Sequence, residues 1–416
     1  MTDAVVPVPP SSDRRAAWLA LSHCQGAGPV LLKRAVEMLG GPEKVLGASA
    51  GELARVDGIG SVRAQSILRT SAGFDGAALL EQCAARAVRV LCPDDPDWPP
   101  GLLPIPDPPV VLYLRGRMIR NDVLAVGIVG SRRCTLYGRE QAEKFAAGLA
   151  QAGVSVVSGG ARGIDTAAHV GAMRAGGRTV VVQGCGLEHC YPPENVDLYD
   201  RIVREDRGAV ISEFPLDQPP LAENFPPRNR IIAALALGVL VVEANLRSGS
   251  LITARLAADD YGREVFALPG RVDSVASSGT HCLIKSGAAA LVECVPDILL
   301  ALGRGDLVAT CPEESRGEAA SAPSPRGAGT RRAPPADESA PPAGVRQSLD
   351  AAEPHLTAPQ RKIVEALRSG PSGVDSLCEI CSLPASVVVA ELTFLQIRGL
   401  VRRGADQTYQ LVSVEK

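Results

Sequence analysis

The sequence predicts an α/β protein with a Rossmann-like open parallel sheet, a helical domain before it and a winged-helix domain after it. Apolar, valine-rich segments alternate with helical segments between residues 122 and 302. These segments lack the polar alternation of half-exposed strands, which is typical of strands buried on both faces. Helical patterns occupy both ends of the chain, and a Pro/Ala/Ser-rich stretch precedes the last of them.

The N-terminal part is expected to contain a tail, a helical domain and a connector. Residues 1–14 are rich in Pro and predict a disordered tail, whereas residues 15–75 have the pattern of short helices. Residues 57–64 (DGIGSVRA) resemble the hairpin of a helix-hairpin-helix motif, whose backbone N–H groups hold a DNA phosphate. A plain turn inside a packed, SAM-like domain explains them equally well, so both interpretations stay open. Residues 76–121 predict a connector that docks onto the next domain and ends in an apolar strand at 110–114.

The central domain, residues 122–302, is expected to contain the parallel sheet. Its predicted strands are 124–129, 154–157, 179–182, 209–212, 239–243, 265–268 and 289–292. In open sheets of this kind, ligands bind beyond the carboxyl ends of the strands. That edge is therefore where we look for a site.

The C-terminal part is expected to be a flexible linker, residues 303–353, followed by a winged helix, residues 354–416. Residues 385–397, where a recognition helix should lie, contain no Lys or Arg, and the basic residues Arg398, Arg402 and Arg403 come just after them. This pattern favours a protein contact or an accessory role over the binding of duplex DNA in the major groove.

Composition and hydropathy argue against a uniformly basic nucleic-acid coat protein and against a membrane-spanning or secreted protein. The formal net charge is −3 and the pI is about 6.0, so phosphate binding would need a local basic patch. Aromatic residues make up only 3%, so an aromatic residue near a polar loop carries more weight as a base-stacking platform. No apolar run is long enough to span a membrane, and the first residues do not form a signal peptide.

The 11 cysteines have no framework spacing and predict reduced thiols in a cytoplasmic protein. Cys378 and Cys381 form the single CxxC, without a second pair or a nearby His. We interpret them as small buried residues one helical turn apart, and we expect no metal.

Glycine, serine and arginine recur at the carboxyl ends of the predicted strands. The positions concerned are Gly130, Ser131 and Arg132 after the first strand; Ser158, Gly159, Gly160, Arg162 and Gly163 after the second; Phe225, Arg228, Asn229 and Arg230 after the fourth; and Ser248 and Gly249 after the fifth. Glycines let backbone N–H groups approach an anion, and the helices that follow present their N-termini to it.

The arginines of these loops are expected to share one rim, which consists of Arg132, Arg162, Arg228, Arg230 and Arg247. Phe225 lies among them in the sequence and would stack on a base. Simpler roles exist, because glycine turns serve any strand-to-helix connection and Asp165 would pair with Arg162. The coincidence of basic loops at one edge still predicts an anion site.

No catalytic constellation is evident. The GxGxxG spacing, the Walker A motif and HExxH are all absent, so we expect no nucleotide cofactor and no catalytic residue. His169 follows Asp165 by one helical turn and is interpreted as a helix-surface or capping residue rather than a base.

Several blocks resemble the signature motifs of the DprA/Smf family, in the family's order. They are residues 129–132, 158–165, 212–215, 225–232 and 248–254. The resemblance implies a dimeric, non-catalytic protein that binds single-stranded DNA without sequence preference and promotes RecA loading in natural transformation. It also implies that Arg132 and Arg228 hold phosphate, that Gly159, Gly160 and Gly163 admit the DNA backbone, and that Phe225 stacks a base. One departure is His281, where the family more often has a small residue or Cys followed by Asn.

Two other functions remain to be weighed. The Gly-rich loop at 158–160 also resembles that of nucleotide phosphoribohydrolases, but Ser158 replaces their Pro and their catalytic pattern is absent. A scaffold that acts only through its helical end domains is the second alternative.

Overall fold

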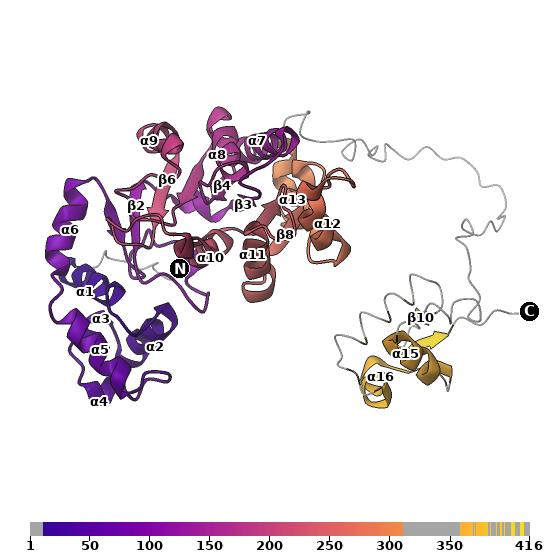
Figure 1. Ribbon diagram of the computed structural model, residues 1–416, viewed down its shortest axis with the longest axis horizontal. Coiled ribbons are helices and arrows are strands. Elements are labelled where there is room, and N and C mark those ends of the chain that lie inside the picture. Colours follow the sequence, from indigo (N-terminus) through magenta and orange to yellow (C-terminus); the bar gives the residue numbers. More distant parts are fainter. Residues whose placement is uncertain are drawn as a thin grey trace, which may run out of the picture. The chain divides into compact units, whose positions relative to one another are not determined.

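The computed structural model describes residues 11–310 and, beyond them, 358–368, 370, 372–381, 383, 388, 392, 395, 401–403 and 408–411. The chain divides into two compact units, Met1–Ser324 and Pro325–Lys416 (Figure 1). Residues 1–10 of the predicted tail and residues 311–353 of the predicted linker lie outside the described residues.

Short helices build the first part of unit 1. They are α1 (Ser12–Ser22), α2 (Pro29–Leu39), α3 (Pro42–Leu46), α4 (Ala50–Leu53), α5 (Ser61–Ser71) and α6 (Gly76–Ala85). Helix α1 begins at Ser12, within the segment expected to be a tail, because the Ser11 hydroxyl caps it by accepting a hydrogen bond from the Arg14 N–H (3.2 Å). Trp18, Leu19 and Leu21 on this helix are buried in the core of the helical part.

The connector contributes two strands to the sheet, β1 (Arg89–Leu91) and β2 (Leu112–Gly116). Strand β2 runs antiparallel to both β1 and β6 (Gly208–Ser212), so the sheet is antiparallel at this edge and not parallel throughout as expected. Tyr113 on β2 is buried in the same core as the helices, which ties the helical part to the sheet.

The sheet has the strand order β1-β2-β6-β5-β4-β3-β7-β8-β9 among the described residues. Its remaining strands are β3 (Ala125–Val129), β4 (Ser155–Ser158), β5 (Thr179–Val182), β7 (Gly238–Val241), β8 (Glu264–Ala267) and β9 (Ala290–Leu291). From β6 to β9 every neighbouring pair is parallel, as predicted. The chain winds outward in one direction from β3 to β6 and in the other from β7 to β9. The topological switch point therefore lies between β3 and β7, where Gly127 pairs with Val239.

Helices cover both faces of the sheet (Figure 1). The helices are α7 (Leu136–Gln151), α8 (Ile164–Arg174), α9 (Val196–Arg204), α10 (Phe225–Leu235), α11 (Ser250–Arg255), α12 (Ser278–Lys285) and α13 (Val295–Ala301). Short 3₁₀ turns lie at η1 (Pro100–Leu102), η2 (Arg120–Val123), η3 (Pro193–Asn195), η4 (Ala222–Asn224), η6 (Val275–Ser277) and η7 (Gly305–Thr310), and a π-helical turn at η5 (Leu256–Asp260). Helices α7, α8 and α13 share one apolar core, and α10 and α11 share another with the connector. Because helices cover both faces of the sheet, its strands must be apolar on both sides, as the sequence pattern predicted.

Unit 2 has its own core. Helices α15 (Ala358–Arg368) and α16 (Val374–Cys381) pack with the antiparallel pair β10 (Val401–Arg403) and β11 (Tyr409–Leu411). Cys381 is buried there and Cys378 packs against the same core. Most of the predicted recognition helix at 385–397 lies outside the described residues.

Candidate functional site

A pocket of about 450 Å³ lies at the switch point, beyond the carboxyl ends of β3 and β7. Its walls come from the loop after β3, the loop after β7 with the start of α11, and the start of α10. Eight of the fourteen predicted site residues line it: Gly130, Ser131, Arg132, Phe225, Arg228, Asn229, Ser248 and Gly249. The structure thus brings together residues that are up to 119 positions apart in the chain (249 − 130).

Arg132 and Arg133 supply the exposed positive charge of this pocket. The Arg132 guanidinium lies over the Phe225 ring, with its Cζ 4.7 Å from the ring centroid. Phe225 is partly exposed at the first position of α10. A cation and an aromatic ring at the mouth of one pocket are the two groups that bind a phosphate and a base.

Arg228 reaches the same pocket from beneath. It is only 2% exposed, and its Nη1 donates hydrogen bonds to the carbonyl oxygens of Gly159 and Val182. Burial lowers the pKa of this guanidinium, and the nearby Asp165 carboxylate opposes that effect. Arg228 therefore links the ends of β4 and β5 while it contributes charge to the pocket floor.

Arg230 does not join the predicted rim, and that expectation is wrong. Its side chain is buried and pairs with Glu213 and, at 3.4 Å, with Asp107 of the connector. Arg247 is exposed but does not line the pocket. The rim arginines thus separate into exposed and buried groups that the sequence alone did not distinguish.

Ser158, Gly159 and Gly160 lie buried behind the pocket wall. The Ser158 hydroxyl donates to the Ile128 carbonyl oxygen (2.5 Å). A Cβ on Gly159 would lie 2.3 Å from the Arg228 guanidinium, and one on Gly160, whose φ is +67°, would lie 2.1 Å from the Tyr199 hydroxyl. These glycines make room for groups of the protein itself, and their contact with a ligand stays a prediction.

Arg162 pairs with Glu194 (Nε to Oε1, 2.5 Å) rather than with Asp165, which corrects the expected pairing. Asp165 is instead buried beside the pocket, and burial raises its pKa to about 6 despite the nearby charges of Arg228 and Arg132. Arg162 and Gly163 line a neighbouring pocket of about 490 Å³, to which Arg132 also belongs.

His169 is fully buried, so its predicted position on the helix surface or at a cap is wrong. Its Nδ1 lies 2.7 Å from the Thr179 hydroxyl, and burial lowers its pKa to about 3. The imidazole is therefore neutral at physiological pH and forms part of the packing between α8 and β5.

Tyr191 was missed by the sequence analysis. Its ring lies 5.3 Å from that of Phe225, centroid to centroid, and it is partly exposed. An aromatic residue in the polar loop between β5 and α9 was a usable signal, because the chain contains only 14 aromatic residues.

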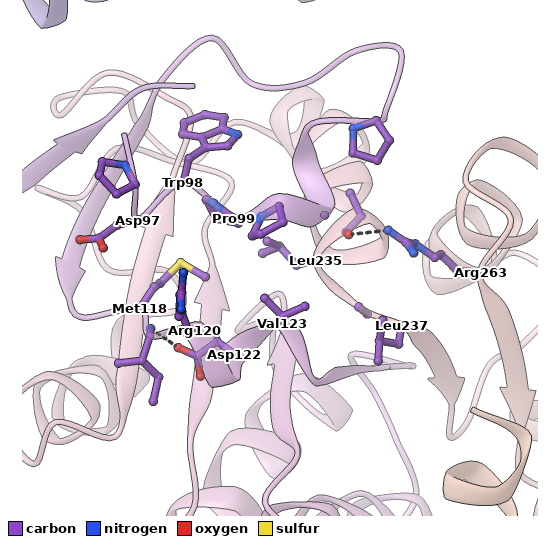
Figure 2. Close-up of a pocket in the computed structure, with 17 residues that line it drawn as sticks. Asp97, Trp98, Pro99, Met118, Arg120, Asp122, Val123, Leu235, Leu237 and Arg263 are labelled. Carbon is purple, nitrogen blue, oxygen red and sulfur yellow. Dashed lines mark hydrogen bonds between the residues drawn. The ribbon is translucent and has the colours of Figure 1, made fainter. Parts of the chain in front are cut away.

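A second pocket, of about 400 Å³, lies at the opposite edge of the sheet, before the amino ends of β3 and β7 (Figure 2). Trp98, Met118 and Leu235 give it apolar walls. Its charged lining residues are two arginines and two aspartates, Arg120, Arg263, Asp97 and Asp122. These charges balance, so the positive pocket at the switch point is the better anion site.

Among the described residues, no group of three or more His, Cys, Asp or Glu side chains is placed to bind a metal. Within the same residues, no helix combines the length and the apolar character that crossing a membrane requires.

Comparison with known proteins supports the resemblance. The family model described as DNA recombination-mediator protein A matches residues 89–303, and the DprA winged helix domain matches residues 347–407. Protein Smf of Synechocystis sp. is 35% identical over 409 residues, which cover 96% of this chain and 99% of that protein. The chain belongs to the DprA/Smf family.

Other DprA/Smf proteins agree in fold and sequence. DNA processing protein DprA of Streptococcus pneumoniae is 45% identical over 194 residues, or 47% of this chain and 67% of that protein. An X-ray structure of DprA from the same organism superposes with a TM-score of 0.59 and 34% identity, covering 70% of this chain and 98% of that one. The predicted family and the predicted fold class, with a winged helix at the C-terminus, are confirmed.

Proposed function

We propose that this DprA/Smf protein binds single-stranded DNA without sequence preference in the switch-point pocket and passes it to the RecA recombinase. The observation that carries the proposal is the contact between exposed Arg132 and the Phe225 ring at the pocket mouth. The description of the matching family as a recombination mediator supports the transfer step.

A single strand fits this arrangement better than a duplex does. A base must leave the helical stack before it can lie against Phe225, and bases of a single strand are already free to do so. Stacking and phosphate contacts are made equally with every base, so tolerance of sequence follows.

Binding requires no catalytic group. Asp165 has a pKa near neutrality, which is a property that catalytic acids also have. Here burial alone accounts for it, because the nearby Arg228 guanidinium acts in the opposite direction and lowers the pKa of Asp165. We therefore propose a non-catalytic role, exercised by a homodimer as the family resemblance implies.

The proposal is tested by the affinity for an oligothymidylate at several salt concentrations. Arg132→Ala is expected to weaken binding about tenfold and to lower the salt dependence by about one phosphate contact. Arg120→Ala, at the opposite edge of the sheet, is the matched control and should bind like the wild type. Equal affinity of the wild type and Arg132→Ala would refute the pocket assignment.

The transfer step needs its own measurement. Stimulation of RecA assembly on single-stranded DNA is expected for the wild type and should fall with Arg132→Ala in parallel with DNA affinity. Sedimentation of the protein alone tests the homodimer. If the protein binds single-stranded DNA tightly but has no effect on RecA assembly, the transfer step is wrong and only the binding function stands.

A further inference from the structure

Four side chains form a continuous row beside the switch-point pocket. Arg132 lies over Phe225, the Phe225 and Tyr191 rings are 5.3 Å apart at an angle of 51°, and the Arg162 Cζ lies 5.8 Å from the Tyr191 centroid. We refer to Arg132, Phe225, Tyr191 and Arg162 as the arginine–aromatic row. Arg132 and Phe225 line the switch-point pocket, whereas Tyr191 and Arg162 do not.

Both end residues of the row, Arg132 and Arg162, line a second hollow of about 490 Å³, and Arg132 lines the switch-point pocket as well. We refer to it as the arginine bay, and its charged lining residues are Arg132, Arg133, Arg139, Arg162, Arg174, Glu143 and Glu194. Five arginines against two glutamates leave a formal charge of +3 (5 − 2), in a chain whose total is −3. Such a concentration of one sign attracts a polyanion.

Some of the arginines in the bay are already paired with a glutamate and are less available to a phosphate. Glu194 pairs with Arg162 and Glu143 pairs with Arg174. Arg133 and Arg139 are exposed, and within the described residues neither takes part in an ion pair. Together with Arg132, these two side chains are the described arginines of the bay that lie outside ion pairs, and a phosphate would bind to them.

We propose that the strand leaves the switch-point pocket along the arginine–aromatic row and enters the arginine bay. Tyr191 stacks a second base, next to the one on Phe225, and Arg133 and Arg139 bind the phosphates that follow. The proposal rests on the proposed function and adds to it a path, a second stacking platform and two phosphate contacts.

The contact between Arg162 and Tyr191 does not obstruct this path. Both members of the Arg162–Glu194 pair are about half exposed, with side-chain exposures of 51% and 52%. Exposed pairs of this kind contribute little to stability, so Arg162 moves off the ring at small cost. A base on Tyr191 gains a stacking contact that is made with any of the four bases.

The test compares two lengths of oligothymidylate on the full-length protein. A strand of about 4 nucleotides fills the pocket alone, whereas one of about 12 also reaches the bay. Tyr191→Ala and Arg139→Gln are each expected to weaken binding of the long strand about tenfold and to leave the short strand nearly unchanged, because neither side chain lines the switch-point pocket. Arg139→Gln should also lower the salt slope for the long strand by about 0.7, which corresponds to one phosphate. Arg120→Gln is the control for the loss of an exposed arginine.

A second variant separates stacking from folding. Tyr191→Trp keeps an aromatic face and should bind the long strand like the wild type, with quenching of its indole fluorescence. Trp18 and Trp98 are buried and supply a constant background. Loss of affinity in Tyr191→Ala together with its recovery in Tyr191→Trp supports the row as the path.

The outcomes distinguish this inference from the function on which it rests. If Tyr191→Ala and Arg139→Gln bind the long strand like the wild type while Arg132→Ala does not, the path is wrong and the pocket stands. Equal weakening for both lengths also overturns the path, because it would mean that these residues only shape the pocket. If the wild type binds neither strand, both proposals fail.

Discussion

Arg132 and Arg228 stand in two of the signature blocks and carry the same charge, yet their surroundings differ. Arg132 is exposed beside Phe225, whereas the Arg228 Nη1 donates to the Gly159 and Val182 carbonyl oxygens. A phosphate that approaches Arg132 displaces only solvent and counterions. At Arg228 it meets a guanidinium that already holds two backbone segments together, so we infer that this residue positions the pocket wall.

Arg228→Ala is therefore expected to destabilise the fold as well as to weaken DNA binding. Its removal leaves two buried carbonyl groups and the Asp165 carboxylate without their partner, which costs about 3–5 kcal/mol of unfolding free energy. Urea unfolding measures this, and Arg132→Ala is the matched variant that should unfold like the wild type. Loss of DNA affinity in Arg228→Ala at unchanged stability would assign the residue to ligand contact alone.

Asp165 predicts a dependence of stability on pH. Burial raises its pKa from 3.8 to about 6, so folding favours the protonated form. The resulting stabilisation is present below about pH 4 and is lost as the pH rises through about 6. Asp165→Asn stays neutral and should gain about 3 kcal/mol relative to the wild type between about pH 4 and pH 7.

Urea unfolding of both proteins across this pH range provides the test. The attraction between the Asp165 carboxylate and Arg228 exists only where Asp165 is ionised and is already contained in its pKa, so the change of the difference with pH is what is diagnostic. A difference between the two proteins that does not vary with pH would show that Asp165 titrates normally.

Sequence alone placed the site residues at the right edge of the sheet but did not give their burial. Motif spacing locates Arg228 and Arg230 after a strand, and it cannot tell whether a guanidinium faces solvent, a carbonyl or a carboxylate. The partners of Arg230, Glu213 and Asp107, lie 17 and 123 residues away in the chain, and only the fold brings them together. Tyr191 offered a signal as an aromatic residue in a polar loop, but its contact with Phe225 depends on the fold.

At the scale of elements, the pocket depends on three loops that backbone hydrogen bonds join to one another. The Ile164 N–H at the start of α8 donates to the Ser131 carbonyl oxygen (3.3 Å), and the Ser131 N–H donates to the Glu243 carbonyl oxygen (2.7 Å). The loops after β4, β3 and β7 are thereby linked in series. Gly163 stands between them with a φ of +80°, and a Cβ there would lie 2.3 Å from the Ser131 oxygen.

Gly163→Ala is expected to separate these loops. The strained backbone and the clash with a carbonyl oxygen together should cost about 2–4 kcal/mol and should displace Arg132, which lowers DNA affinity. Gly73→Ala is the control, since it lies outside the pocket and nothing lies within 4 Å of a Cβ built there. Thermal unfolding and oligonucleotide binding of both variants check this, and equal stability of the two variants would contradict it.

Some strands were predicted from the sequence and others were missed, and the two groups differ in the length and pattern of their apolar runs. The buried parallel strands were found because their apolar runs are continuous, whereas β1 has only three residues and no pattern of its own. Strand β2 was expected at 110–114 and is observed at Leu112–Gly116. Its register is set by pairing with β6, nearly 100 residues later, which periodicity cannot reveal.

For the whole molecule, the separation into two units predicts which part binds DNA. The buried cores of the described residues do not mix, because three clusters lie wholly in unit 1 and one lies wholly in unit 2. Both the switch-point pocket and the arginine bay belong to unit 1. A chain that ends at Thr310 should therefore fold, unfold at the same temperature as unit 1 of the full protein, and bind an oligothymidylate within about twofold of it.

The same truncation decides what the winged helix contributes. If DNA affinity persists while stimulation of RecA falls, unit 2 acts through protein contact, as the lack of Lys and Arg in residues 385–397 favours. If affinity for duplex DNA is lost selectively, unit 2 binds duplex in spite of that sequence. A chain ending at Thr310 that folds but no longer binds single-stranded DNA would refute the assignment to unit 1, because every side chain of the pocket and the bay is still present in it.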